Sequence, residues 1–249
     1  MESDAMVVDV SRDWAIACDV QHRFMRGVDP TIDTLDYSAR CRQVLELGGD
    51  CYDFVPLADD RLALTIADAS GKGLPAALMI SNVQSSLRTA ALLTGNDVAA
   101  VVKAVNRQVY ASSLADRYAT LFYGVFDGAT RRLRYVNAGH NPPMVVRRNN
   151  SIDWLESGGA PVGMFQDWTY KEDVVQLNPG DLIVAYTDGV IETVGPAREE
   201  WGIEGLRKAV AESTALCADE IVHAIFASMD GFSQGRQADD ATIVALRVH

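Results

Sequence analysis

The order of strand-like and helix-like segments constrains the fold of this chain more than any other feature of its sequence. The pattern is strand-like from about residue 30 to residue 68, and it turns helical in two long segments that begin near Pro75 and at Asn96 or Asp97. It is strand-like again from residue 119 to residue 189, and two more helical patches precede a last strand, ATIVALRV. A parallel α/β sheet would alternate its strands and helices regularly. The observed order predicts antiparallel sheets with helices on their outer faces, an α+β layered domain.

Four segments give the clearest strand signals. VLEL (44–47) and RLALTIAD (61–68) are apolar or alternating and are separated by PLADDR, which predicts a hairpin turn. ATLFYGVFD (119–127) and RLRYVNAG (132–139) predict a second hairpin. Each predicted hairpin joins two strands that follow one another in sequence. We therefore expect sheets in which such consecutive strands pair with each other.

The N-terminal part of the chain predicts a helix over residues 11–26, with an apolar side and with Ser11 or Asp13 as its cap. No internal repeat, low-complexity tract or linker divides the chain, and 249 residues with 48% apolar content can fill one core. We therefore expect one compact domain overall, with residues 1–35 as an N-terminal helical segment and residues 36–249 as its main part.

Charge and cysteine usage exclude several classes of protein. The net charge of −12 argues against nucleic acid and against an anionic membrane surface as partners, since both bind basic faces. No apolar run approaches the roughly 18 residues of a spanning helix, and the N-terminus is acidic rather than signal-like. The cysteines form no CxxC pair and, with the four histidines, no zinc-ligand spacing, which favours reduced thiols. We expect a soluble cytoplasmic protein.

Acidic residues stand at the ends of four separate strand-like segments. Asp50 follows two glycines, Asp68 ends RLALTIA, and Asp188 ends LIVAYT, while Asp239 and Asp240 directly precede the last strand. An Asp beside Gly at a strand end is most simply a turn residue. If several of these carboxylates met at the rim of a sheet, however, they would need a cation to remain ionised, and oxygen ligands select Mg²⁺ or Mn²⁺. The pattern alone leaves both interpretations open.

Other motif-like residues carry weaker signals. Gly71-Lys72-Gly73 lacks the spacing of a phosphate-binding P-loop, so Lys72 is expected to be a solvated loop residue, with contact to substrate phosphate as the alternative. His140 lies in NAGHNPP, where a structural role in a tight turn is favoured over a catalytic acid. His22 and His223 are expected on helix surfaces or at an interface.

Seven ordered motifs add a resemblance that spacing alone does not give. GGDCYDF, DASGKGLPAALM, YATLFYGVFD, NAGHNPP, APVGM, GDLIVAYTDGVIE and DDATIV, over about residues 20–248, resemble the SpoIIE-type branch of the PPM metal-dependent protein serine/threonine phosphatases, which act in bacterial stress response and sporulation. The resemblance implies two packed antiparallel sheets flanked by helices, with residues 36–249 as the phosphatase domain. It agrees with the α+β order inferred above.

The resemblance also implies a metal site and a reaction. Its ligands would be Asp50, Asp68, the carbonyl of Ala69, Asp188 and Asp239, holding two Mn²⁺ or Mg²⁺ ions. Those ions would activate a water for attack on phosphoserine or phosphothreonine. The two glycines before Asp50 would let the chain turn that carboxylate toward the metals.

Three positions depart from related phosphatases. Eukaryotic relatives carry a histidine two positions after the metal aspartate, where this chain has Ser70, so the resemblance identifies no general acid. The arginine that grips phosphate in those relatives has only Arg42 as a weak counterpart. Cys51 replaces a usual tyrosine and is expected to be a tolerated packing change.

The implied substrate is a phosphorylated regulatory protein of the anti-sigma-factor antagonist type. The helix at residues 11–26 is a candidate contact for a regulator or for a second copy of the chain in a homodimer. The main alternative is a non-catalytic binding module of the same fold. A nucleotide-handling protein, suggested by SGKG, is the alternative from another enzyme class.

Overall fold

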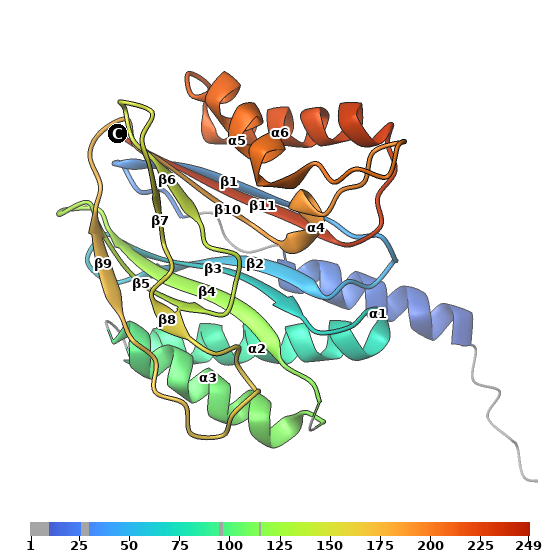
Figure 1. Ribbon diagram of the computed structural model, residues 1–249. Helices are drawn as coiled ribbons and strands as arrows, with labels where there is room; N and C mark the ends of the chain where they lie inside the picture. The colour runs from blue at the N-terminus through green and yellow to red at the C-terminus, as the bar shows by residue number, and fades with distance from the viewer. Residues whose placement is uncertain (1–9, 26–29, 95–96, 115) are drawn as a thin grey trace, which may run out of the picture.

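Two β-sheets packed face to face, with helices on their outer faces, form the body of the protein (Figure 1). The structure is a computed structural model, and it describes residues 10–25, 30–94, 97–114 and 116–249. The expected α+β architecture, an α-β-β-α sandwich, is confirmed. None of the helices in these ranges is long and apolar enough to cross a membrane.

One sheet contains the last strand of the chain in an inner position. Its strands, in spatial order, are β1 (Leu35–Arg42), β11 (Ala241–Val248), β10 (Leu182–Tyr186), β6 (Met144–Val146) and β7 (Ile152–Trp154). All of its pairings are antiparallel. Its outer face carries α4 (Asp188–Ile191), α5 (Gly202–Ser213) and α6 (Ala218–Ser233).

The other sheet consists mainly of the two hairpins expected from the sequence and their neighbours. Its strands, in order, are β2 (Asp50–Leu57), β3 (Arg61–Ala69), β4 (Ala119–Asp127), β5 (Arg132–Ala138) and β8 (Gly158–Gly159), and β9 (Asp173–Gln176) also pairs with β5. The short β5–β8 pair is parallel and the other pairings are antiparallel. On the outer face lie α2 (Leu74–Thr94) and α3 (Val98–Ser112), the latter capped by Asp97, whose side chain accepts a 2.9 Å hydrogen bond from Ala100 N.

Three apolar cores separate the layers. The middle core lies between the sheets and includes Leu64, Phe122 and Val244, all fully buried. The second joins β2–β5 to α2 and α3, and the third joins β10 and β11 to α5 and α6. Because the central strands bury both faces, their sequences are continuously apolar rather than alternating. This packing fixes the strand ends that carry the acidic residues.

The prediction of a strand at residues 44–47 is wrong. The strand lies earlier, at β1, and residues 44–47 form a bent loop in which Val44 is 40% and Leu45 is 52% exposed. The backbone N–H of Val44 donates to the carboxylate of Asp240 rather than to a neighbouring strand, which removes it from any ladder. Asp50 accordingly begins β2 instead of following a strand.

The N-terminal helix α1 (Val10–Met25) agrees with the expected helix, whose residue 26 lies outside the described ranges. It packs beside α2 and the start of β2 (Figure 1). The expected helix end at Gly95 and the candidate cap Asn96 also lie outside those ranges. The division into residues 1–35 and 36–249 stays a prediction.

Candidate metal centre

The four predicted acidic ligands come from strand ends that meet at one end of the sandwich. Asp50 and Asp68 are directly opposite each other in the β2–β3 ladder. Asp188 begins α4 immediately after β10, and Asp239 stands two residues before β11. Each sheet therefore supplies two acids, and the structure brings all four into mutual electrostatic range.

Asp50 is the most deeply buried of the four. Its side chain is 1% exposed, and its Oδ2 accepts hydrogen bonds of 2.7 Å from the hydroxyls of Thr187 and Thr242. Burial raises the pKa of Asp50 to about 7, although the two hydroxyl hydrogen bonds act in the opposite direction. Thr242 lies in β11 of the opposite sheet and Thr187 directly follows β10 of that sheet, so Asp50 joins the two layers. The sequence carried no signal for either threonine as a partner of Asp50.

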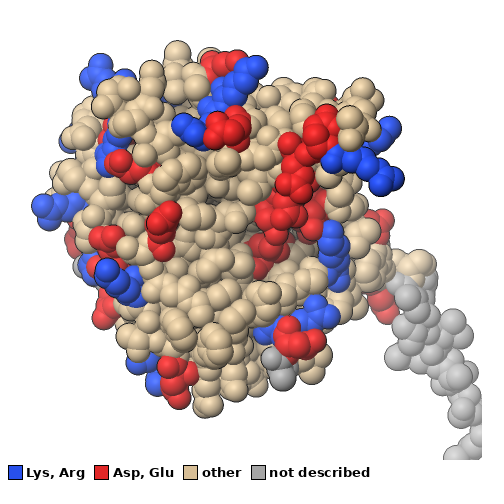
Figure 2. All heavy atoms as spheres, in the orientation of Figure 1, with Lys and Arg blue, Asp and Glu red and all other residues tan. Residues whose placement is uncertain are grey.

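Burial, together with repulsion among the acids, raises the pKa of two further carboxylates in this region. Burial, followed by the charges of Asp50 and Asp188, raises the pKa of Asp68 to about 9. Burial and then the charge of Asp239 raise the pKa of Asp188. Figure 2 shows acidic side chains in a band that runs into a hollow on this face, with basic side chains at its edge. Such a cluster favours either proton uptake or a bound cation.

The two glycines before Asp50 lie in close contact with their neighbours. A Cβ at Gly48 would lie 2.6 Å from Oδ2 of Asp240, and a Cβ at Gly49 would lie 3.3 Å from the carbonyl oxygen of Ala69. The Gly49 carbonyl also accepts a 3.0 Å hydrogen bond from Ala69 N. Side chains at these two positions would push the loop away from Asp240 and Ala69.

Asp240 holds the loop that leads into β2. Its carboxylate accepts hydrogen bonds of 2.8 Å from the backbone N–H groups of Val44 and Gly49, one at each end of the loop. The Asp-Asp pair before the last strand was a visible signal, but the partner loop was not. Asp240 is thus a positioning residue for Asp50.

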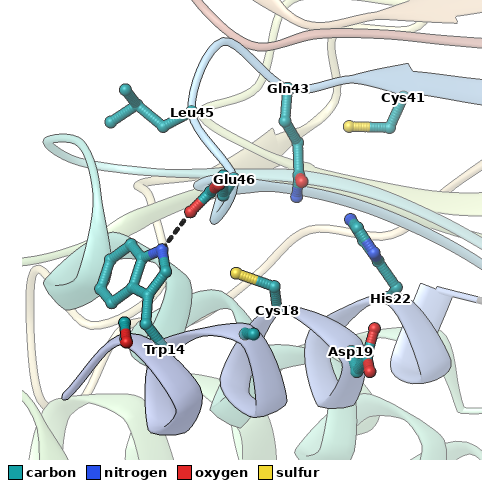
Figure 3. A pocket seen from close by; sticks show the side chains of 10 residues that line it. Trp14, Cys18, Asp19, His22, Cys41, Gln43, Leu45 and Glu46 are labelled. Atoms are coloured by element: carbon teal, nitrogen blue, oxygen red, sulfur yellow. Dashed lines mark hydrogen bonds between the residues drawn. The ribbon is translucent and has the colours of Figure 1, made fainter. Parts of the chain in front are cut away.

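A second clamp on the same loop comes from α1. Gln21, which is buried, donates to the Gly48 carbonyl at 2.8 Å and accepts from Gly48 N at 3.1 Å. Trp14 donates to Glu46, and an open groove of about 1050 Å³ lies between α1 and the loop (Figure 3). The N-terminal helix therefore touches the segment that presents Asp50.

The donor set fits a hard divalent cation chemically. It consists of carboxylate oxygens with a nearby backbone carbonyl, which are ligands that Mg²⁺ and Mn²⁺ prefer. As the side chains stand, no group of three or more His, Cys, Asp or Glu in the described part of the chain is arranged to hold an ion. Neighbouring groups contact these carboxylate oxygens instead. The hydroxyls of Thr187 and Thr242 donate to Asp50, and Lys72 Nζ lies 2.6 Å from Asp239 Oδ2.

Three other candidates have structural roles. The ring of His140 is buried and bonds to Thr120 Oγ1 at 2.8 Å, and burial lowers its pKa to about 4, which agrees with the structural interpretation. Arg42 pairs with Asp230 at 2.7 Å and stacks on a ring of α6, which ties β1 to that helix and gives the guanidinium a structural contact. Cys51 is buried in the core beneath α2, as expected of a packing residue.

His22, His223 and Asp53, the second acid of GGDCYDF, lie apart from this chemistry. His223 is exposed on α6, beside Arg40 and Asp219, as expected of a helix-surface residue. His22 lines the groove beside α1 (Figure 3). Asp53 is buried and forms a two-pronged ion pair with Arg88 of α2, with one N···O distance of 2.6 Å, so it anchors a helix.

Comparison with known proteins identifies the family. The family model described as Stage II sporulation protein E (SpoIIE) matches residues 58–249. Phosphoserine phosphatase RsbU of Bacillus subtilis (strain 168) is 30% identical over 243 residues, which cover 96% of this chain and 71% of that protein.

Two solved structures show the same fold. The SiaA-PP2C domain of Pseudomonas aeruginosa matches with a TM-score of 0.83 at 21% identity, over 96% of this chain and 97% of that one. The catalytic domain of the serine/threonine protein phosphatase PstP, in complex with 2 manganese ions, matches with a TM-score of 0.65 at 18% identity, over 86% of this chain and 98% of that one. The chain therefore belongs to the SpoIIE family, a branch of the PPM (PP2C) phosphatases, and is a protein serine/threonine phosphatase.

Proposed function

We propose that the acidic cluster is the catalytic centre and binds two Mn²⁺ or Mg²⁺ ions through Asp50, Asp68, the Ala69 carbonyl, Asp188 and Asp239. The observation that carries this proposal is the convergence of four carboxylates from two sheets, three of them with a raised pKa. The manganese complex of PstP supports a centre of two ions.

The residues of the chain itself hold the site in shape. Thr187 and Thr242 orient the Asp50 carboxylate, and Asp240 fixes the loop that carries it. Divalent cations bound there would activate water and offset the charge of the phosphoryl group. His140 is unsuited to protonate a leaving serine or threonine, because its ring is buried and neutral at pH 7.

The substrate we propose is a phosphorylated bacterial regulatory protein of the anti-sigma-factor antagonist type. The similarity to RsbU, named a phosphoserine phosphatase, supports phosphoserine as the group attacked. A decisive assay incubates the full chain with a phosphoserine peptide and with an aryl phosphate, each with Mn²⁺, with Mg²⁺ or after chelation. We expect turnover that needs metal in the millimolar range, because oxygen-only sites that keep waters bind such ions weakly.

Chelation should stop turnover reversibly, and added Mn²⁺ should restore it. Full activity after exhaustive chelation would refute the metal centre. No turnover with any metal would favour the alternative, a non-catalytic binding module. Capture of phosphorylated candidates by the Asp188→Asn protein, compared with their unphosphorylated forms, tests the substrate class separately.

The N-terminal helix is proposed as the contact for a regulator or for a second copy of the chain. On α1, Ile16 is 50%, Val20 is 48% and Phe24 is 40% exposed, while Gln21 of the same helix clamps the loop before Asp50. An Ile16→Asp substitution should lower the mass measured in solution if the apolar face joins two copies. Gln21→Ala should lower activity without changing that mass. If neither variant differed from the wild type, the proposed role of α1 would be wrong.

A further inference from the structure

Lys72 lies on the rim of the acidic cluster, on a short loop between β3 and α2. Its Nζ lies 2.6 Å from Asp239 Oδ2 and donates to the Ala238 carbonyl at 3.1 Å. The side chain is 58% exposed, so the ammonium group reaches both the cluster and solvent. It also acts electrostatically on Asp188, whose carboxylate it favours in the charged form.

The loop is braced so that the base of Lys72 has a defined position. Ser70 N donates to the Tyr118 carbonyl at 2.9 Å, and Tyr118 N donates to Ser70 Oγ at 3.1 Å. Arg117 Nη1 donates to the Ser70 carbonyl at 2.8 Å, and its guanidinium lies so close to Gly71 that a Cβ there would overlap it. Gly71 has φ +94°, a conformation that a non-glycine residue would rarely adopt. The chain thus turns tightly at Gly71 and presents Lys72 beside Asp239.

The charges at the site call for a positive group of this kind. Four carboxylates balance the formal charge of two divalent cations, so a further positive group at the rim would add to the attraction that the bound cations exert on a phosphoryl dianion. Arg42 is committed to Asp230, and Arg88 to Asp53. Among the described residues, one shared carboxylate and one carbonyl hold Lys72 at the cluster, and its ammonium is charged at neutral pH. A cation that binds Asp239 would compete for this carboxylate and release the ammonium group at the rim.

We propose that Lys72 is a substrate-binding residue that contacts the phosphoryl oxygens of the phosphoprotein, with Arg117 as a positioning residue that braces its loop. This inference rests on the proposed catalytic centre. The inference adds a contact with substrate from the loop after β3. The affinity for phosphate would then depend on Lys72, which is not one of the proposed metal ligands.

The test compares Lys72→Met, which removes the charge but keeps the length, with Lys72→Arg, which keeps the charge. Lys103→Met is the matched control, because Lys103 is exposed on α3. The probe is inorganic phosphate, titrated calorimetrically into the full chain loaded with Mn²⁺. We expect phosphate affinity to fall about tenfold or more in Lys72→Met, as for loss of a charge-assisted hydrogen bond, and to be largely retained in Lys72→Arg. Lys103→Met should bind as the wild type does.

Kinetics with a phosphoserine peptide give a second readout. Lys72→Met should raise KM more than it lowers kcat, while its Mn²⁺ affinity stays equal or increases because a competitor for Asp239 is gone.

If phosphate affinity and KM were unchanged in Lys72→Met, the proposal would be overturned and Lys72 would be a counter-ion of Asp239, even if the wild type is fully active. Conversely, phosphate binding that depends on Lys72 in a protein without turnover would support the contact and refute the catalytic proposal. Wild-type protein that binds no phosphate would also overturn it.

Discussion

The hydroxyl of Thr242 donates a 2.7 Å hydrogen bond to Oδ2 of Asp50, from an inner strand of one sheet to the first residue of a strand in the other. Both groups are buried. The polar end of the sandwich is therefore held together by side chains, whereas the core between the two sheets is apolar. The first prediction concerns this bond.

Thr242→Val keeps the side-chain shape and removes the hydroxyl. The buried Asp50 carboxylate then loses one of its two hydroxyl donors, so we expect a loss of unfolding free energy of about 1–2 kcal/mol without metal. Urea unfolding of the chelated protein measures it. Thr94→Val, which removes an exposed hydroxyl bonded within α2, is the control and should change stability much less. Equal stabilities of the two variants would contradict the bridging role of Thr242.

Asp188→Asn separates catalysis from stability. The substitution removes one charge from a repelling cluster, so the metal-free protein should melt at the same temperature or higher. Turnover should fall at least about a hundredfold through loss of charge stabilisation at the metal centre. Mn²⁺ should raise the melting temperature of the wild type more than that of the variant, because bound metal stabilises only the folded state. A variant that melts earlier without metal yet still turns over substrate would rule out Asp188 as a ligand.

Without metal, stability should fall as pH rises above about 4. The folded-state pKa of Asp50 is raised to about 7 and that of Asp68 to about 9, so the folded protein holds protons that the unfolded chain releases near its ordinary value of 3.8. This contribution is complete below pH 3.8 and is lost as pH rises through the folded-state values. Melting curves from pH 4 to 9 in chelator test it, and Asp68→Asn should show a shallower decline. Wild-type and variant curves with the same slope would refute the shift at Asp68.

His140 should contribute with the opposite sign. Its folded-state pKa is lowered to about 4 from 6.5, so its stabilising contribution is complete above pH 6.5 and is lost as pH falls toward 4. At 1.36 kcal/mol per unit, the full loss is about 3 kcal/mol. The difference in unfolding free energy between the wild type and His140→Gln isolates this effect from that of the acids. If that difference stayed constant from pH 7 to pH 4, the ring would not be buried in its neutral form.

The layered fold was predictable from sequence because it depends on local signals, whereas the pattern alone left open whether the acids meet, and only the resemblance implied a shared site. Apolar runs gave the central strands, and an acid at the end of each run placed the carboxylates at strand ends, as at Asp68 and Asp188. The identity of the metal ligands stays a prediction that the variants above test.

Long-range contacts explain what the sequence did not reveal. VLEL has the composition of a strand, but the N–H of Val44 is bound by Asp240, which lies 196 residues further along the chain. The strand β1, LDYSARCR, is only partly buried and so lacks a clear apolar pattern, and its sole described ladder partner is the last strand. A short window of sequence contains no signal for the contact of Val44 with Asp240 or for the pairing of β1 with β11.

The inner position of β11 has a consequence for how the protein is made. β11 pairs with β1 on one side and with β10 on the other, although nearly two hundred residues separate β1 from β11. During synthesis, the ribosome must release residues 241–248 before that sheet can close, and Asp239 reaches the other acids only then. The β2–β3 hairpin, with Asp50 and Asp68, is therefore synthesised long before Asp239. Until then the acidic cluster is incomplete. If the cluster is the proposed catalytic centre, phosphatase activity should begin only when β11 is in place.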